Sequence, residues 1–255
     1  MANSPSGDSL ISRVVRILET FDTDRTSRSV SDIARRTGIP SSTTHRLVAE
    51  LSEHGLLERD ERGNVHVGMH LWELAMRGSQ ALRLRQIAIP FMESVQAKVR
   101  QHTQLAVLED DEALFIERLS SRDSGANITR IAGRLPLHAS SSGLVLLAYA
   151  DAALQDRVLA GELQQRSAET VTDPARLRSM IGEIRRIGHV IAPGYIAPES
   201  VGVAVPVKGP GGGTIAALSV VLPRDHGDFG TVVMYLKSAS TGITRAMRDS
   251  RNFSH

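Results

Sequence analysis

One stretch of the sequence gathers short polar side chains where they could contact a nucleic acid. Residues 42–46 come just before Leu47, Val48 and Leu51, whose spacing predicts the apolar stripe of a helix that Ser41 is expected to cap. Short donors and acceptors near a helix N-terminus can reach base edges in the major groove of a DNA duplex. The candidate DNA-contacting residues of this helix are Ser41, Ser42, Thr43, Thr44, His45 and Arg46.

Four nearby arginines suit the phosphates of such a duplex. Arg35 and Arg36 precede the helix, and Arg59 and Arg62 follow it. The alternative is an ordinary helical hairpin whose arginines are solvated. Because the whole chain carries a net charge of only +2, any DNA contact must come from local charge placement or from duplicated sites in a dimer.

The surrounding sequence places these residues on two helices and a hairpin. Ser31 is expected to cap the first helix and Gly38 to end it, while Pro40 prevents its simple continuation. Two short alternating runs around a polar turn with a glycine, at residues 56–67, predict a β-hairpin. An amphipathic helix over residues 9–21 would complete a small core. The arrangement is helix, turn, helix and wing.

A second cluster could bind an anion. Residues 133–143, GRLPLHASSSG, form a proline-containing turn that leads into three serines at an expected helix start. Unpaired N–H groups at a helix start, with serine hydroxyls beside them, suit a carboxylate. The alternatives are that the serines only cap the helix and that His138 is a structural residue. No Gly-x-Ser-x-Gly elbow supports a hydrolase built from the serines, His138 and Glu199, so we expect no enzyme and no catalytic residue.

The sequence from Gln104 onward predicts a mixed α+β domain. Strands are expected at residues 105–108, 113–116, 128–131, 189–192, 201–207 and 214–222, and helices at 140–150, 151–160, 174–187 and 229–248. The absence of a βαβ dinucleotide fingerprint favours an antiparallel sheet flanked by helices. Helical spacing also runs over residues 70–85, and a second helix over 87–102 is expected to begin near Pro90.

Composition excludes several classes of protein. The chain has 255 residues, 41% of them hydrophobic, and no cysteine, which removes disulfides, thiol chemistry and cysteine-type zinc sites. We expect no cofactor and no metal. The first residues lack a secretory signal and no window of about eighteen apolar residues occurs, so we expect a cytoplasmic protein with no membrane partner. Residues 1–8 are small and polar, which predicts a disordered tail.

Four motifs in series resemble the IclR family of bacterial transcriptional regulators: SDIARRTGIPSSTTHRLVAELSEHGLLERD, VHVGMHLWELA, GRLPLHASSSG and PVKGPGGGTIAALSVVLP. The resemblance implies a mainly α N-terminal winged helix-turn-helix DNA-binding domain (9–69), a linker helix (70–90) and a GAF-like α+β effector-binding domain (91–252). It also implies homodimers, often assembled into homotetramers, that bind near-palindromic operators in double-stranded DNA. We expect a repressor, with repression relieved when the ligand binds. The alternatives are an activator of the same family and a winged helix that contacts proteins.

The resemblance also implies a pocket for a small organic acid, such as glyoxylate, pyruvate or an aromatic carboxylate. Its expected lining, carried over by motif, is Leu135, Ser140, Ser141, Ser142, Gly143, Val203, Val205, Ser219 and Val221. Asn127 is added because it stands eight residues before Leu135, and Glu199 is the candidate for the acidic residue of the pocket. Two features depart from the family pattern: Leu144 stands where members often carry lysine, and the segment 194–202 is shorter than is usual in the family before its glycine. The expected scarcity of aromatic residues in the pocket favours a small or aliphatic ligand.

Overall fold

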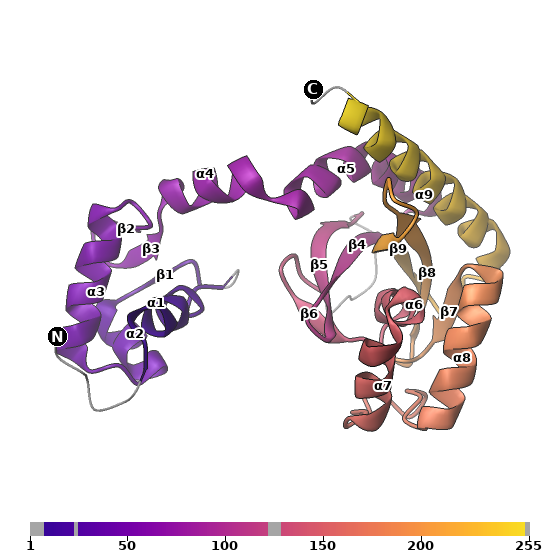
Figure 1. Cartoon of the computed structure of the whole chain (residues 1–255), viewed down its shortest axis with the longest axis horizontal. Coiled ribbons are helices and arrows are strands. Elements are labelled where there is room, and N and C mark those ends of the chain that lie inside the picture. The colour runs from indigo at the N-terminus through magenta and orange to yellow at the C-terminus, as the bar shows by residue number, and fades with distance from the viewer. Residues whose placement is uncertain (1–7, 23–24, 122–128, 253–255) are drawn as a thin grey trace. The chain divides into compact units, whose positions relative to one another are not determined.

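The chain folds into two compact units, Met1–Ser79 and Gln80–His255, which we describe separately. The structure is a computed structural model that describes residues 8–22, 25–121 and 129–252 (Figure 1). The tail expected at residues 1–8 lies outside the described residues, apart from Asp8. Among the described helices, none is long and apolar enough to cross a membrane.

The N-terminal unit is a winged helix-turn-helix. Its elements are α1 (Leu10–Leu18), β1 (Ser27–Arg28), α2 (Val30–Thr37), α3 (Ser41–Glu53), β2 (Leu57–Arg59), β3 (Val65–Val67) and α4 (Met69–Gly78). The strands form an antiparallel sheet in the order β1-β3-β2, so the predicted hairpin gains a third strand. Ile17, Ile33, Leu47, Leu57 and Val65 are fully buried or nearly so and join helices and wing in one core.

Two helix starts differ from the sequence expectation. The cap of α2 is Ser29, whose Oγ accepts a hydrogen bond from the Asp32 N–H at 3.2 Å, so Ser31 lies inside the helix. Pro40 occupies the cap position of α3 and makes no side-chain hydrogen bond, so Ser41 is the first helical residue. Gly38 ends α2 as predicted, in a left-handed conformation with φ of 66° that glycine adopts without strain.

The C-terminal unit is an antiparallel sheet covered by helices on both faces (Figure 1). Its elements are α5 (Gln80–Val99), β4 (His102–Glu109), β5 (Glu112–Leu119), β6 (Arg134–Pro136), α6 (Ser141–Tyr149), α7 (Ala152–Ala160), α8 (Pro174–Ile187), β7 (Val190–Pro193), β8 (Ser200–Lys208), β9 (Thr214–Pro223) and α9 (Phe229–Asn252). The strand order is β6-β5-β4-β9-β8-β7. The architecture confirms the predicted α+β fold, with an antiparallel sheet flanked by helices.

Each face of the sheet has its own hydrophobic core. Phe115, Leu147 and Ala217 belong to the core under α6, α7 and α8, whereas Val203 and Leu218 belong to the core under α5 and α9. Because both faces are covered, inward and outward positions of the central strands are equally apolar. The face to which a given residue points is therefore decided by register.

The helices around Ser79 differ from expectation, and so does the third predicted strand of the C-terminal unit. The helical spacing predicted over residues 70–85 is interrupted at Ser79, which has an extended backbone, and α5 starts at Gln80 with Pro90 in its interior. The strand expected at residues 128–131 is absent from the described part, residues 129–131. A turn at Arg130–Gly133, with Ala132 in a left-handed conformation, shifts the strand to β6.

Candidate effector pocket and DNA-contacting surface

Helix α3 presents most of its predicted DNA-contacting residues to solvent. Ser41, Ser42, His45 and Arg46 are exposed and Thr43 is half-buried. Thr44 is the exception, because it is fully buried and its Oγ1 donates to the carbonyl oxygens of Pro40 and Ile39 at 3.2 and 3.3 Å. We therefore withdraw Thr44 as a DNA-contacting residue. Its role is to fix the turn between α2 and α3.

The candidate phosphate-binding arginines at the end of α2 share one carboxylate. Asp32 forms ion pairs with Arg28 and Arg36, each at 3.0 Å, and with Arg35. Burial would raise the pKa of Asp32, but the hydrogen bonds from Arg28 and Arg36 outweigh it and hold that pKa below its ordinary value. Asp32 therefore stays ionised and orients both exposed arginines, while it cancels part of their positive charge.

Two of the other candidate DNA-contacting arginines, Arg46 and Arg59, interact with residues four positions away in the sequence. Arg46 lies 3.5 Å from Glu50, one helical turn along α3, and both side chains are largely exposed. In the wing, the Arg59 guanidinium donates to the Gly63 carbonyl at 3.3 Å, and Arg62 is exposed at the tip. Exposed pairs of this kind contribute little to stability, so these arginines can exchange their partners for phosphates at small cost.

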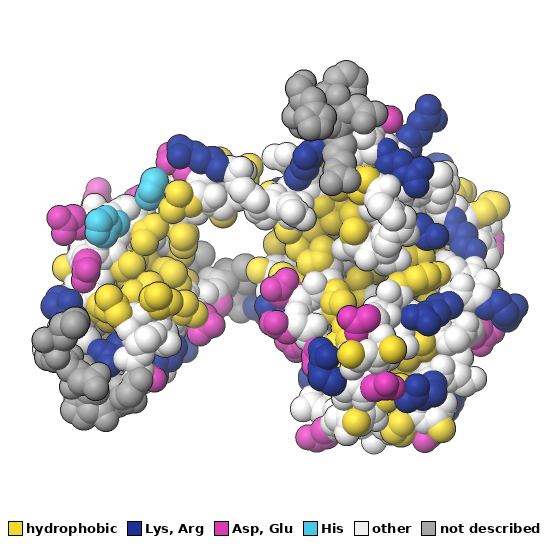
Figure 2. Space-filling model, in the orientation of Figure 1, with side chains coloured by type: hydrophobic (Ala, Val, Ile, Leu, Met, Phe, Trp, Pro, Cys, Tyr) yellow, Lys and Arg dark blue, Asp and Glu magenta, His cyan; other side chains and the backbone are white. Residues whose placement is uncertain are grey.

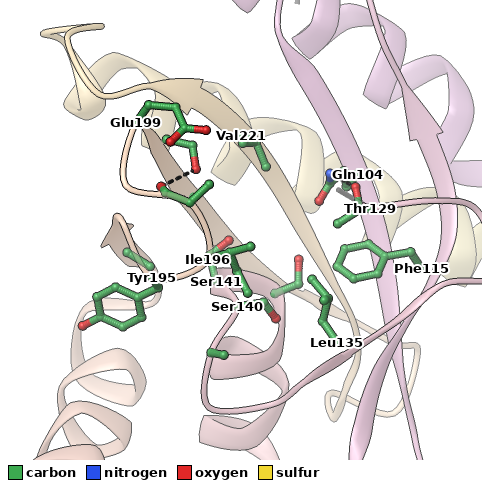
Figure 3. Close-up of a pocket in the computed structure, with 16 residues that line it drawn as sticks. Gln104, Phe115, Thr129, Leu135, Ser140, Ser141, Tyr195, Ile196, Glu199 and Val221 are labelled. Atoms are coloured by element: carbon green, nitrogen blue, oxygen red, sulfur yellow. Dashed lines mark hydrogen bonds between the residues drawn. The ribbon is translucent and has the colours of Figure 1, made fainter. Parts of the chain in front are cut away.

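A pocket opens in the C-terminal unit beside the start of α6 (Figure 3). Its empty space, counted together with the opening to solvent, is about 630 Å³. The lining residues are Gln104, Phe115, Thr129, Leu135, Ala139, Ser140, Ser141, Ser142, Ala192, Tyr195, Ile196, Ala197, Glu199, Ser200, Gly202 and Val221. They come from all six strands of the sheet, the segment before β6, the serine turn and the segment between β7 and β8.

The serine turn supplies the polar end of the pocket. Ser140 caps α6 by accepting a hydrogen bond from the Gly143 N–H at 3.0 Å, and its carbonyl accepts from the Leu144 N–H at 2.8 Å. This arrangement leaves the amides of Ser141 and Ser142 without an acceptor inside the helix. Two N–H groups at the positive end of a helix, within the pocket wall, suit a carboxylate. The serines thus both cap the helix and line the pocket.

Six of the eleven predicted pocket residues line the pocket: Leu135, Ser140, Ser141, Ser142, Glu199 and Val221. Val203 and Val205 do not, because they point to the opposite face, into the core beneath α5 and α9. Gly202, one residue earlier on β8, lines the pocket in their place. This error is a one-residue slip in a strand whose side chains alternate between faces.

The remaining predictions for the pocket fall outside its lining. Ser219 is fully buried beneath it and accepts a hydrogen bond from Ser142 Oγ at 2.8 Å. Gly143 packs on the backbone of the preceding turn, where an added Cβ would lie 2.6 Å from Leu137 Cα. Asn127 lies outside the described residues. Ser219 and Gly143 therefore support the pocket from behind.

Two aromatic residues that the sequence did not indicate line the pocket, so the expectation of few aromatics was wrong. Phe115 and Tyr195 lie on different sides of it (Figure 3). The Tyr195 hydroxyl is directed away, 3.8 Å from Met180 Sδ. Burial raises the pKa of this hydroxyl, Glu169 adds to the increase and Arg176 opposes it. Tyr195 therefore offers the pocket a neutral ring.

The outer wall, residues 194–200, is held by side chains from neighbouring loops. Ser167 Oγ donates to the Gly194 carbonyl at 2.5 Å, and Thr170 Oγ1 donates to the Tyr195 carbonyl at 2.6 Å. Arg224 donates to the Pro198 carbonyl at 3.0 Å and pairs with Glu169 at 2.5 Å. Glu199 lies exposed at the rim. The wall is therefore built as a fixed surface that a ligand can pack against.

His138 does not form a catalytic pair with the serines. It is buried, and its Nε2 is 2.9 Å from the Gln164 carbonyl oxygen, which supports a structural role. The residues that the structure describes contain no group of three His, Asp or Glu side chains suited to a metal ion.

Comparison with known proteins identifies the family. The model of the IclR helix-turn-helix domain matches residues 10–61, and that of the bacterial transcriptional regulator IclR C-terminal domain matches residues 77–236. The HTH-type transcriptional regulator XynR of Escherichia coli is 27% identical over 242 residues, which cover 93% of this chain and 96% of XynR.

Solved structures extend the comparison to the whole fold. An IclR homolog from Microbacterium hydrocarbonoxydans, complexed with 4-hydroxybenzoate, is 51% identical, with a TM-score of 0.91 over 94% of this chain and all of that chain. An IclR homolog from Microbacterium sp. strain HM58-2 is 50% identical, with a TM-score of 0.64 over 94% of this chain and 98% of that one. The chain therefore belongs to the IclR family of transcriptional regulators, with a DNA-binding helix-turn-helix and a C-terminal effector domain.

Proposed function

We propose that the protein is a repressor whose affinity for its operator is lowered by an aromatic carboxylic acid bound in the C-terminal pocket. The observation that carries the proposal is that Ser141 and Ser142, the first two residues of α6, line a pocket that Phe115 and Tyr195 also line. The amides suit the carboxylate, and the aromatic side chains suit a ring. This replaces the expectation of an aliphatic ligand.

Three relatives support the finer points of the proposal. The homolog that is 51% identical holds 4-hydroxybenzoate, which combines a ring and a carboxylate. The Escherichia coli proteins named transcriptional repressor IclR and HTH-type transcriptional repressor AllR are 25% and 27% identical, over about 70% of this chain. They favour repression over the alternative, activation.

We further propose that the protein acts as a homodimer, with an exposed apolar face of the N-terminal unit as the contact. Leu10, Ile11 and Val15 on α1, and Met69 and Trp72 on α4, are between 46% and 75% exposed. Figure 2 shows hydrophobic side chains gathered on one face of this unit. A contiguous exposed apolar area of this kind marks an interaction site, and a two-fold dimer would present two α3 helices to successive major grooves.

The route from pocket to DNA in this proposal runs through the start of α5. A β-bulge at Ile116 places Phe115 on the pocket face and Glu117, which pairs with Leu105, on the face toward α5. The buried Glu117 carboxylate lies 2.7 Å from Arg85 of α5 and also accepts from the Arg118 N–H at 2.8 Å. Arg118 in turn donates to the carbonyl of Thr129, a pocket residue, at 2.5 Å.

Glu117→Gln is expected to weaken this coupling. The variant keeps its shape and an acceptor for the Arg118 N–H but loses the ion pair with Arg85, so the ligand-induced change in operator affinity should fall about fivefold. Fluorescence anisotropy of labelled operator DNA, with and without ligand, measures this ratio. Glu112→Gln is the control, since Glu112 lies on the same strand in an exposed pair with Arg134 at 3.6 Å. An unchanged ratio in Glu117→Gln would remove this ion pair from the route.

The proposed function is tested by gel-shift of the DNA upstream of the protein's own gene, with a panel of carboxylic acids. We expect retardation that falls steeply with salt and is relieved by an aromatic acid. Arg46→Ala should weaken the retardation by about 10- to 100-fold without changing ligand binding. Arg178→Ala is the matched control, because Arg178 is an exposed arginine of the C-terminal unit, where it pairs with Asp156.

Three results would contradict parts of the proposal. Retardation that no acid changes would remove the effector, and retardation tightened by the acid would contradict ligand-relieved repression. No salt-dependent retardation on that region or on neighbouring promoters would overturn DNA binding and favour a winged helix that contacts proteins.

A further inference from the structure

Gln104 is a buried amide in the pocket wall whose hydrogen-bonding capacity is only half used. It lies on β4, is 2% exposed and lines the pocket beside Phe115 and Thr129 (Figure 3). Its Nε2 donates to Thr129 Oγ1 at 2.5 Å, and its Oε1 accepts from Ser219 Oγ at 3.5 Å. A glutamine amide has two donor hydrogens and two acceptor sites. Among the described residues, one N–H and one carbonyl lone pair of Gln104 therefore have no protein partner.

A row of hydrogen bonds fixes the direction of this amide. Ser142 Oγ donates to Ser219 Oγ at 2.8 Å, so the Ser219 hydrogen is available for Gln104 Oε1. Gln104 and Ser219 are direct neighbours on paired strands β4 and β9. Exchanging the oxygen and nitrogen of Gln104 would remove the acceptor of the Ser219 hydrogen, in a side chain that is fully buried, so the observed direction of the amide is favoured. The row thus holds a fixed donor and a fixed acceptor in the pocket wall.

The unused pair matches a hydroxyl group. A hydroxyl both donates and accepts, so it can engage the free N–H and the free lone pair together. A carboxylate only accepts and would face the Gln104 carbonyl oxygen unfavourably, whereas the amides at the start of α6 suit its charge. Gln104 lies across the pocket from Ser141 in Figure 3. The ends of the pocket therefore differ in chemistry: one suits an anion and the other suits a neutral donor and acceptor.

We propose that Gln104 determines specificity by recognising a hydroxyl group on the ring of the effector, at the end away from its carboxylate. The inference rests on the proposed function, in which the effector is an aromatic acid. An acid without the hydroxyl would cover Gln104 and leave a buried donor and acceptor unpaired. A site built to bond a hydroxyl discriminates strongly against such an analogue.

The test is calorimetric titration of the full chain with 4-hydroxybenzoate, benzoate and 4-methylbenzoate. The wild type is expected to bind 4-hydroxybenzoate about 10- to 100-fold more tightly than benzoate. The methyl compound fills the same space without a hydrogen bond, so it should bind no better than benzoate. This comparison needs no substitution and does not depend on the folding of a variant.

Gln104→Met then tests the residue itself. Methionine has nearly the same length but no amide, so the ratio of the two affinities should fall to within about threefold of one, mainly through weaker binding of 4-hydroxybenzoate. Retained binding of benzoate shows that the pocket is intact. Thr103→Val is the matched control, because Thr103 is the adjacent residue of β4, is fully buried, and its Oγ1 has no partner among the described residues. Its ratio should not change.

The outcomes separate the two proposals. Binding of both acids with a ratio that Gln104→Met leaves unchanged would overturn the role of Gln104 and leave the proposed function standing. Equal binding of 4-methylbenzoate and 4-hydroxybenzoate to the wild type would do the same. Binding of neither acid to the wild type would overturn the proposed effector class, and the hydroxyl recognition with it.

Discussion

Ser141→Trp is expected to abolish the response to effector while leaving the protein bound to its operator. Ser141 is the first residue of α6, 7% exposed, and its Oγ lies 2.5 Å from the position of a Cβ built on Gly202. The turn of α6 and strand β8 therefore meet closely here, and an indole has room only in the pocket. Filling that space should lower ligand affinity by about 100-fold, whereas the helix-turn-helix lies in a separate compact unit.

Titration calorimetry and operator anisotropy on the same sample check this result. Ser238→Trp is the matched control, because Ser238 is an exposed serine on α9 and should tolerate the same side chain without loss of either function. A normal ligand response in Ser141→Trp would show that the serine turn does not hold the effector. Loss of DNA binding together with ligand binding would contradict the separation of the two sites.

The N-terminal unit could be predicted from sequence because its signals are local. Gly38 and Pro40 mark the turn, and the spacing of Leu47, Val48 and Leu51 marks the buried side of α3. Thr44 was misplaced for a physical reason. Thr44 precedes Leu47 by three residues, Val48 by four and Leu51 by seven, so it lies on the same buried side of the helix. Its hydroxyl donates to backbone carbonyl oxygens. Helical spacing should have outweighed polarity at this position.

From the residues alone, the pocket could be predicted only at the serine turn, whereas Glu199 and Val221 were placed in it through the family resemblance. On β8 the choice between Gly202 and Val203 depends on sheet register, and both faces of this strand are apolar because both are covered. Gln104 and Phe115 reach the pocket through strand pairing, and a β-bulge at Ile116 decides which face Phe115 joins. Such non-local choices leave no periodic signal in a single sequence.

Gly143→Ala is expected to be the most destabilising of these single changes to the effector domain. A Cβ at this position would lie 2.6 Å from both Cα and the carbonyl oxygen of Leu137, and 2.7 Å from Ser140 Oγ. Two of these neighbours are backbone atoms that cannot rotate away, and the third is the cap of α6. Overpacking of this kind costs about 2–3 kcal/mol, so calorimetry should show the domain melting about 5–10 °C lower.

The matched control is Gly182→Ala in α8, where nothing lies within 4 Å of an added Cβ. Alanine is the better helix former by about 1 kcal/mol, so this variant should melt slightly higher than the wild type. If alanine lowers the melting temperature at Gly143 and raises it at Gly182, then the close approach of the Leu137 backbone, and not helix propensity, is the reason that glycine is needed at position 143. That approach holds the turn with the Ser141 and Ser142 amides in the pocket wall, so Gly143→Ala should also weaken effector binding below its melting point. Equal melting shifts at the two positions would instead mean that the turn yields to a methyl group and does not fix these amides.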